Sequence, residues 1–328
     1  MFEVAAAVVS WPFGRYKSCL AFRSLVITMS SKYILLTAAK DEEKYIAEVI
    51  QSVVKQTILP AAWFIMDDGS TDRTASIVES YAASHPFIHL QSAGARGGRN
   101  FGSQYKAVMA AYELAKSLEF DFVGVVDADQ APQTINYYEA IIGEFLRNSK
   151  LGIASGFLYE RNRIGKWECR RGNSIDSVAG GTAMFRRSCF DQIGGYTPLY
   201  NGGSDWLVQI EAKMTGWELL VRPELHIFHY RPTSSAGGIW RGMFRAGLMD
   251  ASFGSHPIFE FIKCCRRITV PPIFFGSIVR LSGFFWWKLS RRKPLIRADK
   301  VRFLRKEQLA KLRNSFWPFG EKSAGQLK

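Results

Sequence analysis

The sequence predicts an α/β fold with a mostly parallel sheet flanked by helices, followed by a basic, aromatic-rich helical region at the C-terminus. Two observations predict this organisation. Short apolar runs alternate with helical patterns, and acidic or glycine-rich segments follow several of the runs. Positive charge is also concentrated towards the C-terminus, so the two regions are interpreted separately.

The individual elements are predicted from hydrophobic periodicity. Apolar runs of strand length occupy residues 33–39, 62–66, 87–90 and 122–126. Helical spacing occupies residues 42–57, a stretch through Ile77, Val78 and Tyr81, and residues 105–118. Pro60 ends the first of these helices. In open sheets of this kind, ligands bind at the carboxyl ends of the strands, so the residues that follow each strand are the first candidates for a site.

Carboxylates follow two of the predicted strands. Asp67, Asp68 and Asp72 come after the second run, where a tight turn with a helix N-cap would use the same residues. Asp127 and Asp129 come after the fourth run. Neighbouring carboxylates repel and raise each other's pKa, and Mg²⁺ or Mn²⁺ is their natural partner. An Asp-x-Asp sequence is nevertheless common by chance, so this pair alone does not define a metal site.

A third acidic position opens a helix further along the chain. A glycine-rich stretch at 180–187 leads to Asp205, where a carboxylate is also expected from the helix dipole alone. A later strand-like run contains His226 and His229, which alternation puts on opposite faces. One histidine is a candidate metal ligand or diphosphate contact, and a half-buried strand residue is the alternative.

The order and spacing of these segments closely resemble family 2 glycosyltransferases over about residues 33–230. The shared segments are Lys40-Asp41-Glu42, Asp-Asp-Gly-Ser-Thr-Asp, Val-Asp-Ala-Asp, Gly-Gly-Thr-Ala-Met-Phe-Arg-Arg, Ile-Gly-Gly-Tyr, the aspartate that opens a helix, Gly-Trp and a final histidine. The resemblance implies a GT-A fold, a nucleotide-sugar donor, a divalent cation, Mg²⁺ or Mn²⁺, and an inverting transfer.

The resemblance also assigns nucleotide-binding residues by their position. Asp68 would accept a hydrogen bond from the base of the donor. The segment from Thr37 to Ala39, together with Glu42, would line the nucleotide pocket. Asp127 would contact the ribose or a second metal ion.

The metal and the acceptor sides are assigned in the same way. Asp127 and Asp129 match the metal motif of the family, with Asp129 as the direct ligand, and His229 matches a histidine near the metal and the diphosphate. Asp205 matches the catalytic base, which would remove the proton of an acceptor hydroxyl.

Two departures from the family pattern leave the acceptor-side contacts open. Ser204 precedes Asp205 where family members often have glutamate, and the first strand ends in Thr-Ala-Ala-Lys-Asp-Glu instead of the commoner Pro and Asn-Glu pattern. Arg96, Arg99 and Asn100 are candidate diphosphate contacts because the arginine fork suits phosphate, although a solvated loop explains them equally well.

The C-terminal region is both basic and apolar. Residues 260–313 contain fifteen Lys or Arg and three Asp or Glu, which gives +12 of the net +14. The run from Ile268 to Trp287 has about the length of a bilayer span, yet Pro271, Pro272 and Arg280 interrupt it. We therefore expect an interfacial or re-entrant segment, with a core-packing helix pair as the alternative.

These observations divide the chain into four parts. We predict an N-terminal extension at 1–31, a GT-A domain at 32–259, a membrane-associated region at 260–313 and a tail at 314–328. Residues 1–28 precede the foldable pattern and are expected to be a dispensable extension or a misplaced start. Five cysteines without disulfide or zinc spacing favour a reducing setting. The expected location is the cytoplasmic face of the cell membrane, with peripheral or monotopic attachment, or the cytoplasm.

The expected function is a metal-dependent transfer of a sugar from a UDP- or GDP-linked donor to a hydroxyl of a glycan or lipid-linked acceptor, as in polysaccharide biosynthesis. Transfer onto polyprenyl phosphate is the main alternative, because that acceptor needs less help from a base. A nucleotidyltransferase and a basic membrane- or nucleic-acid-binding protein are the others. No nucleic-acid-binding motif accompanies the basic residues, so nucleic acid is not expected as a partner.

Overall fold

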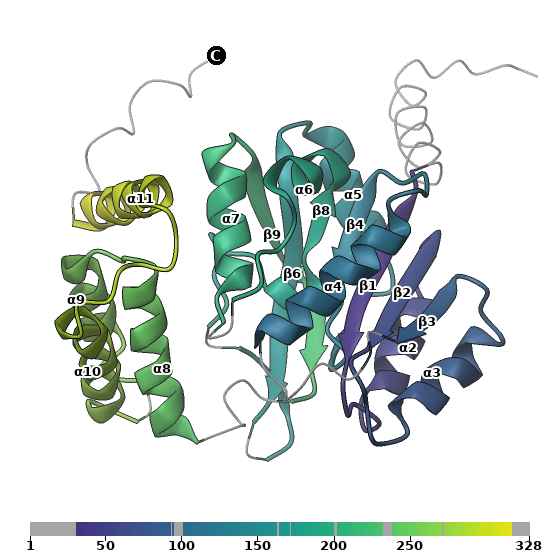
Figure 1. Cartoon of the computed structure of the whole chain (residues 1–328), viewed down its shortest axis with the longest axis horizontal. Coiled ribbons are helices and arrows are strands. Elements are labelled where there is room, and N and C mark those ends of the chain that lie inside the picture. The colour runs from purple at the N-terminus through teal and green to yellow at the C-terminus, as the bar shows by residue number, and fades with distance from the viewer. Residues whose placement is uncertain are drawn as a thin grey trace, which may run out of the picture.

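The computed structural model describes residues 31–316 except 93, 95–100, 163, 171, 200–201, 232–237 and 271. Nine strands of this part form one sheet with helices on both faces, and a unit of four helices lies beside it (Figure 1). Residues 1–28, the candidate contacts Arg96, Arg99 and Asn100, and residues 317–328 of the predicted tail lie outside the described residues.

The predicted elements of the first half occur close to their expected positions. The strands are β1 (Tyr33–Ala39), β2 (Ala62–Asp67), β3 (Ile88–Ser92), β4 (Phe122–Val125), β5 (Gln130–Pro132), β6 (Leu151–Arg161), β7 (Trp167–Cys169), β8 (Met184–Arg186) and β9 (Glu218–His229). The helices beside the sheet are α2 (Ile46–Val54), α3 (Thr74–Ala82), α4 (Phe101–Ala115), α5 (Tyr137–Arg147), α6 (Arg187–Ile193) and α7 (Ser204–Met214), with a 3₁₀ turn η1 at Gly180–Thr182. The helical unit contains α8 (Ile239–Ser252), α9 (Pro257–Arg266), α10 (Phe275–Leu289) and α11 (Ala298–Phe316).

The sheet is mixed, so the prediction of a mostly parallel sheet is wrong. Its order is β3-β2-β1-β4-β8-β6-β9-β5, with β7 paired to β6. The β3-β2-β1-β4 strands and the β6-β9 pair are parallel, whereas β8 runs antiparallel to both neighbours and β5 runs antiparallel to β9. The physical reason is the connection from β6 to β8, which passes through the β7 hairpin and η1 without the crossover helix that a parallel return needs.

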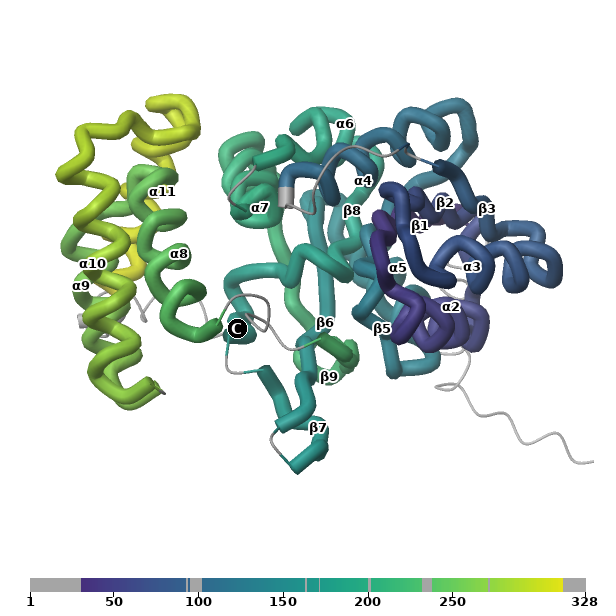
Figure 2. The backbone as a smooth tube through the Cα atoms, turned by 60° about the horizontal axis from the view of Figure 1, so that its bottom comes forward, coloured from purple at the N-terminus to yellow at the C-terminus, as the bar shows by residue number. Residues whose placement is uncertain are grey.

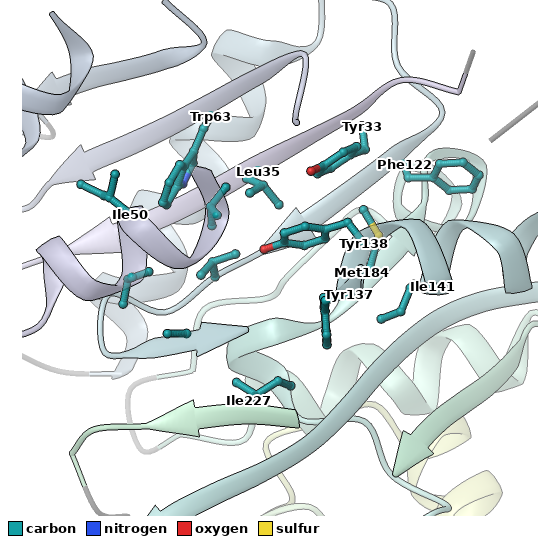
Figure 3. Close-up of a cluster of buried hydrophobic side chains, with 14 of the residues drawn as sticks. Tyr33, Leu35, Ile50, Trp63, Phe122, Tyr137, Tyr138, Ile141, Met184 and Ile227 are labelled. Atoms are coloured by element: carbon teal, nitrogen blue, oxygen red, sulfur yellow. The ribbon is translucent and has the colours of Figure 1, made fainter. Parts of the chain in front are cut away.

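Hydrophobic layers cover both faces of the sheet. In β1, Tyr33 and Leu35 pack into one buried cluster while Ile34 and Leu36 pack into the other, because successive side chains of a strand point to opposite faces. Residues of α2 and α5 complete the first cluster (Figure 3), and residues of α4, α6 and α7 complete the second. Together the two layers fix the strand ends that carry the site.

The helical unit lies on the α7 side of the sheet (Figures 1 and 2). Helices α8 and α10 cross closely, because a Cβ on Gly247 would lie 1.9 Å from the Arg280 carbonyl oxygen and one on Gly283 would lie 2.2 Å from that of Phe244. Helix α11 packs against α7 of the body. The unit therefore begins at Ile239, ahead of the boundary predicted at 260.

Arg280, which interrupts the apolar run, lies inside this unit. Its Nε donates to Glu260 at 2.7 Å, and its guanidinium also pairs with Asp250. Lys263 adds a contact to Asp250 at 3.0 Å. The inner face of α10 thus packs within the helical unit, as the core-packing alternative predicts. In the part of the chain that the structure describes, no helix combines the length and the apolar character needed to cross a bilayer.

Candidate functional site

The nucleotide-binding residues predicted in β1 and β2 meet at one edge of the sheet. The backbone N–H of Asp68 donates to the Ala39 carbonyl at 2.9 Å, and Lys40 Nζ donates to the Asp68 carbonyl at 2.9 Å. Asp68 itself is only 4% exposed, and no described residue donates a hydrogen bond to its carboxylate. This acceptor therefore stays available for a ligand.

The hydrogen bonds of the turn after β2 show which of its acidic residues have a structural role. Asp67 accepts from the backbone N–H of Ser70, and Asp72 accepts from those of Thr74 and Glu43. Both side chains hold the turn ahead of α3, as the tight-turn alternative predicts, although Arg73, the N-cap residue, has no side-chain cap hydrogen bond. Asp68 differs from these two aspartates, because no described residue donates a hydrogen bond to its carboxylate.

The Thr37 side chain lies in the core of the protein. Its side chain is fully buried, donates to the Val126 carbonyl at 2.7 Å and accepts from Trp63 Nε1 at 2.9 Å. Thr37 is satisfied inside the core and does not line a pocket with its side chain. Because Val126 precedes Asp127, the Thr37 hydroxyl instead helps to hold the strand end that carries the acidic motif.

The Asp127 carboxylate is closely surrounded by polar groups. Gln104 of α4 donates to its Oδ1 at 2.7 Å and Gln130 donates to its Oδ2 at 3.0 Å. The η1 turn passes so close that a Cβ on Gly181 would lie 2.0 Å from Oδ2, and the N–H of Asp127 donates to the Gly181 carbonyl at 2.8 Å. Only glycine fits this approach.

Four of the other predicted residues surround Asp127. Burial, together with the charges of Asp129, Asp205 and Glu42, raises the pKa of Asp127 to about 7, and the charge of His229 acts against that rise. The carboxylates are therefore close enough to repel one another, although they come from strand ends and a helix start far apart in the sequence. The site concentrates negative charge at the point where the sequence predicts a cation.

Asp205 also lies against the η1 turn. It lies in the first turn of α7, and a Cβ on Gly180 would lie 2.5 Å from the Cβ of Asp205. Burial raises the pKa of Asp205, while the backbone N–H groups of Trp206 and Asp205 and the charge of Arg170 act against that rise. The pair of adjacent glycines thus brings the predicted base close to the predicted metal motif.

His229 lies at the same place through the pairing of β6 with β9. Its Nδ1 lies 2.9 Å from Glu160 Oε1, and its Nε2 lies 3.8 Å from Asp129 Oδ1. The described residues contain no group of three or more His, Cys, Asp and Glu side chains arranged to hold an ion by themselves. Asp129 and His229 nevertheless fit an ion that also takes phosphate oxygens, as Mg²⁺ does in nucleotide sites.

Arg231 completes the cluster. Its guanidinium forms an ion pair with Glu42, and its Nε lies 3.8 Å from Asp129 Oδ2. The same guanidinium lies over the Tyr45 ring, 5.6 Å from the centroid. One arginine therefore connects the nucleotide side of the site with the predicted metal ligand.

Sequence reasoning missed four polar residues of this site: Gln104, Gln130, Glu160 and Arg231. Two had a local signal, since Gln130 directly follows the Asp-x-Asp motif and Arg231 lies two residues after His229. Gln104 and Glu160 had none, because only the packing of α4 and the register of Glu160 opposite His229 bring them to the site.

The chain matches known proteins in three comparisons. The model of glycosyl transferase family 2 matches residues 35–197. The poly-beta-1,6-N-acetyl-D-glucosamine synthase of Staphylococcus epidermidis is 25% identical over 244 residues, covering 68% of this chain and 56% of that protein. The beta-monoglucosyldiacylglycerol synthase of Synechocystis sp. is 33% identical over 100 residues, covering 29% and 19%.

A solved structure has a similar fold. The mannosyltransferase PcManGT of Pyrobaculum calidifontis, in complex with GDP-Man and Mn²⁺, has a TM-score of 0.50 and 14% identity, covering 92% of this chain and 95% of that one. The chain spans about half the length of the poly-N-acetylglucosamine synthases that it matches.

Proposed function

The chain belongs to glycosyl transferase family 2 and is a glycosyltransferase, and we propose that it transfers a sugar, with inversion, from a nucleotide-diphosphate sugar to an acceptor hydroxyl. The observation that carries this proposal is the η1 turn, where Asp127 lies against Gly181 and Asp205 lies against the adjacent Gly180. A donor-binding carboxylate and a base for the acceptor have to lie this close together to act on one reacting carbon.

The donor side of the proposal rests on two carboxylates and on the residues that would hold an ion. Asp68 would accept from the base of the nucleotide, and Asp127 would accept from the ribose. Asp129 and His229 would hold a divalent cation, which supplies charge neutralisation of the diphosphate when it is bound. The presence of GDP-Man and Mn²⁺ in the similar mannosyltransferase supports this donor class and this kind of ion.

Asp205 would perform the proton transfer. Its carboxylate accepts the proton of the acceptor hydroxyl as the hydroxyl oxygen forms a bond to the anomeric carbon. The bond from that carbon to the diphosphate oxygen breaks on the opposite face, and the nucleoside diphosphate leaves with the electron pair. The names of the two relatives, a polysaccharide synthase and a glucosyl-lipid synthase, support a glycan or a lipid as the acceptor.

Ligand-induced stabilisation tests the donor site. We expect one UDP- or GDP-sugar, with Mn²⁺, to raise the unfolding temperature by several degrees, because a ligand at 100 times its Kd stabilises the native state by about 2.7 kcal/mol. Asp129→Asn should remove the Mn²⁺-dependent part of this shift, as measured by differential scanning fluorimetry with and without the ion.

Asp121→Asn is the matched control, because Asp121 lies at the opposite end of β4 and accepts from the backbone N–H of Lys32. It should respond to the donor like the wild type. The absence of a shift with every nucleotide-sugar would contradict the proposal. Release of pyrophosphate instead of UDP or GDP during turnover would favour a nucleotidyltransferase.

We also propose that the helical unit attaches the enzyme to an anionic bilayer surface. Helices α9 and α10 lie on the side of the unit away from the sheet (Figures 1 and 2). Their exposed apolar side chains are Ile258 and Phe261 in α9 and Phe275, Ile278, Phe285, Trp286 and Leu289 in α10. We call these exposed residues of α9 and α10 together the outer apolar face.

The charges around the outer apolar face support lipid as its partner. Arg266 and Arg267 follow the exposed stripe of α9, and Arg291, Arg292 and Lys293 follow that of α10. Each basic residue held at an anionic surface contributes about 1 kcal/mol, and each large apolar side chain that enters the interface contributes about 1.5–3 kcal/mol. The apolar side chains would enter the hydrocarbon boundary of the bilayer, and the basic side chains beside them would bind the anionic headgroups.

Vesicle co-sedimentation tests this attachment. Replacing Ile278 and Leu289 by serine should weaken binding to phosphatidylcholine vesicles containing phosphatidylglycerol by at least about tenfold, because two apolar contacts are lost. The same changes at Leu59 and Ile164, which are exposed beside the sheet, are the control and should leave binding unchanged. Equal loss in both variants, or equal binding to neutral vesicles, would contradict the proposal.

A further inference from the structure

Arg231 holds a position between two acidic residues with different expected roles. It lies two residues beyond the end of β9 and forms an ion pair with Glu42, which is only 4% exposed. On its other side its Nε lies 3.8 Å from Asp129 Oδ2. The guanidinium therefore contacts both the nucleotide side and the proposed ion ligand at once.

The electrostatics of this arrangement require a cation. The Asp129 side chain is 14% exposed, so both it and Glu42 are largely removed from water. A buried carboxylate without a counter-charge is strongly unfavourable, and the guanidinium offsets one of the two negative charges. A divalent ion on Asp129 would lie close to that guanidinium, and two positive charges at such a separation in a partly buried site repel each other.

We propose that Arg231 is the resident counter-ion of the donor site and is displaced from Asp129 when the divalent ion and the diphosphate bind. This inference rests on the proposed function and adds a coupling between its two ligands. The displaced guanidinium can contact the diphosphate, because its planar fork of N–H groups matches phosphate oxygens. The ion alone must compete with Arg231, whereas the ion with the nucleotide gives Arg231 a new partner.

This arrangement predicts that Mn²⁺ and nucleotide bind cooperatively, and that each raises the affinity of the other by the same factor. Removing the guanidinium should separate the two effects. The ion would lose its competitor and bind more tightly on its own, and the nucleoside diphosphate would lose a contact and bind more weakly. A residue that only supports the fold would change both affinities in the same direction.

The experiment measures Mn²⁺ binding to the nucleotide-free full chain by the electron paramagnetic resonance signal of the free ion. Arg231→Gln should lower the Kd for Mn²⁺ by at least about tenfold and raise the Kd for UDP or GDP, measured by calorimetry at saturating Mn²⁺, by a similar factor. Arg222→Gln removes the same charge from β9, where Arg222 pairs with Glu224 of the same strand and with Glu144 of α5, and should change neither value.

Arg231→Lys separates charge from geometry. Lysine keeps the positive charge but lacks the fork, so the Mn²⁺ affinity should stay near that of the wild type while the nucleotide affinity falls. The inference is overturned if Arg231→Gln binds Mn²⁺ no more tightly than the wild type, or if it loses Mn²⁺ affinity together with thermal stability. If the wild type binds UDP or GDP with Mn²⁺ in those cases, the proposed function stands; if it binds neither, both proposals fail.

Discussion

Asp205→Asn is expected to lower kcat for transfer to a hydroxyl acceptor by about 10²- to 10⁴-fold, the usual contribution of a positioned general base. An amide cannot take the proton of the attacking hydroxyl. The donor should still bind with nearly the wild-type Kd, because the contacts to base, ribose and diphosphate come from other residues. Steady-state kinetics combined with calorimetric donor binding would check both parts.

The fold of this variant should survive the substitution. Burial raises the pKa of Asp205, so the site already opposes a charge there, and the neutral amide removes that cost. Asp176→Asn is a matched control, since Asp176 is an exposed carboxylate paired with Lys311. A loss of less than about tenfold in Asp205→Asn would contradict the role as base and would favour an acceptor that needs none, such as polyprenyl phosphate.

Arg280→Met is expected to destabilise the helical unit by about 3–5 kcal/mol, the usual effect of removing one partner of a buried ion pair. Methionine fills similar space, so the loss comes from the charge and not from a cavity. Asp250 and Glu260, which are 2% and 0% exposed, would then share the remaining contacts to Lys263. Urea unfolding followed by tryptophan fluorescence measures the change, because Trp286 and Trp287 lie in α10.

The pH dependence of this variant gives a second check. Burial and the Asp250 charge already raise the pKa of Glu260, and the loss of Arg280 raises it further. A carboxyl whose pKa is higher in the folded than in the unfolded chain takes up its proton first in the folded state, so the deficit should shrink as the pH falls from about 8 to about 5.5. Arg302→Met, at an exposed position of α11, should show neither effect. A deficit that grows at low pH would contradict the buried-charge explanation.

The first half of the fold was largely predictable because its signals are local. The strand predicted at 33–39 has those bounds in β1, and Asp205 opens a helix as expected. Such elements follow from side-chain periodicity within a few residues. The direction of β8 could not be predicted from the sequence. The residues Met184–Arg186 do not indicate which strands they pair with, and the antiparallel partners of β8 lie some thirty and sixty positions away.

The candidate site shows the same division. Motif order identified the carboxylates that surround Asp127, since each follows a strand or opens a helix at the same edge of the sheet. The roles of Asp67 and Asp72 in the turn could not be separated from that of Asp68 without the hydrogen bonds. Thr37 was assigned to the pocket by position alone, and only the packing of Trp63 and Val126 shows that its hydroxyl belongs to the core.

The sequence by itself determined the class of the elements from β1 to β4 and of the helix at Asp205, the family to which those motifs belong and the region that carries the excess positive charge. Tertiary structure alone decided which distant groups meet: Glu160 with His229 through strand register, Arg231 with Glu42 and Asp129, and Arg280 with two carboxylates from α8 and α9. The physical reason is that hydrophobic periodicity and turn preferences depend on a few neighbouring residues. The partner of a buried charge depends on which distant side chains the folded chain brings next to it.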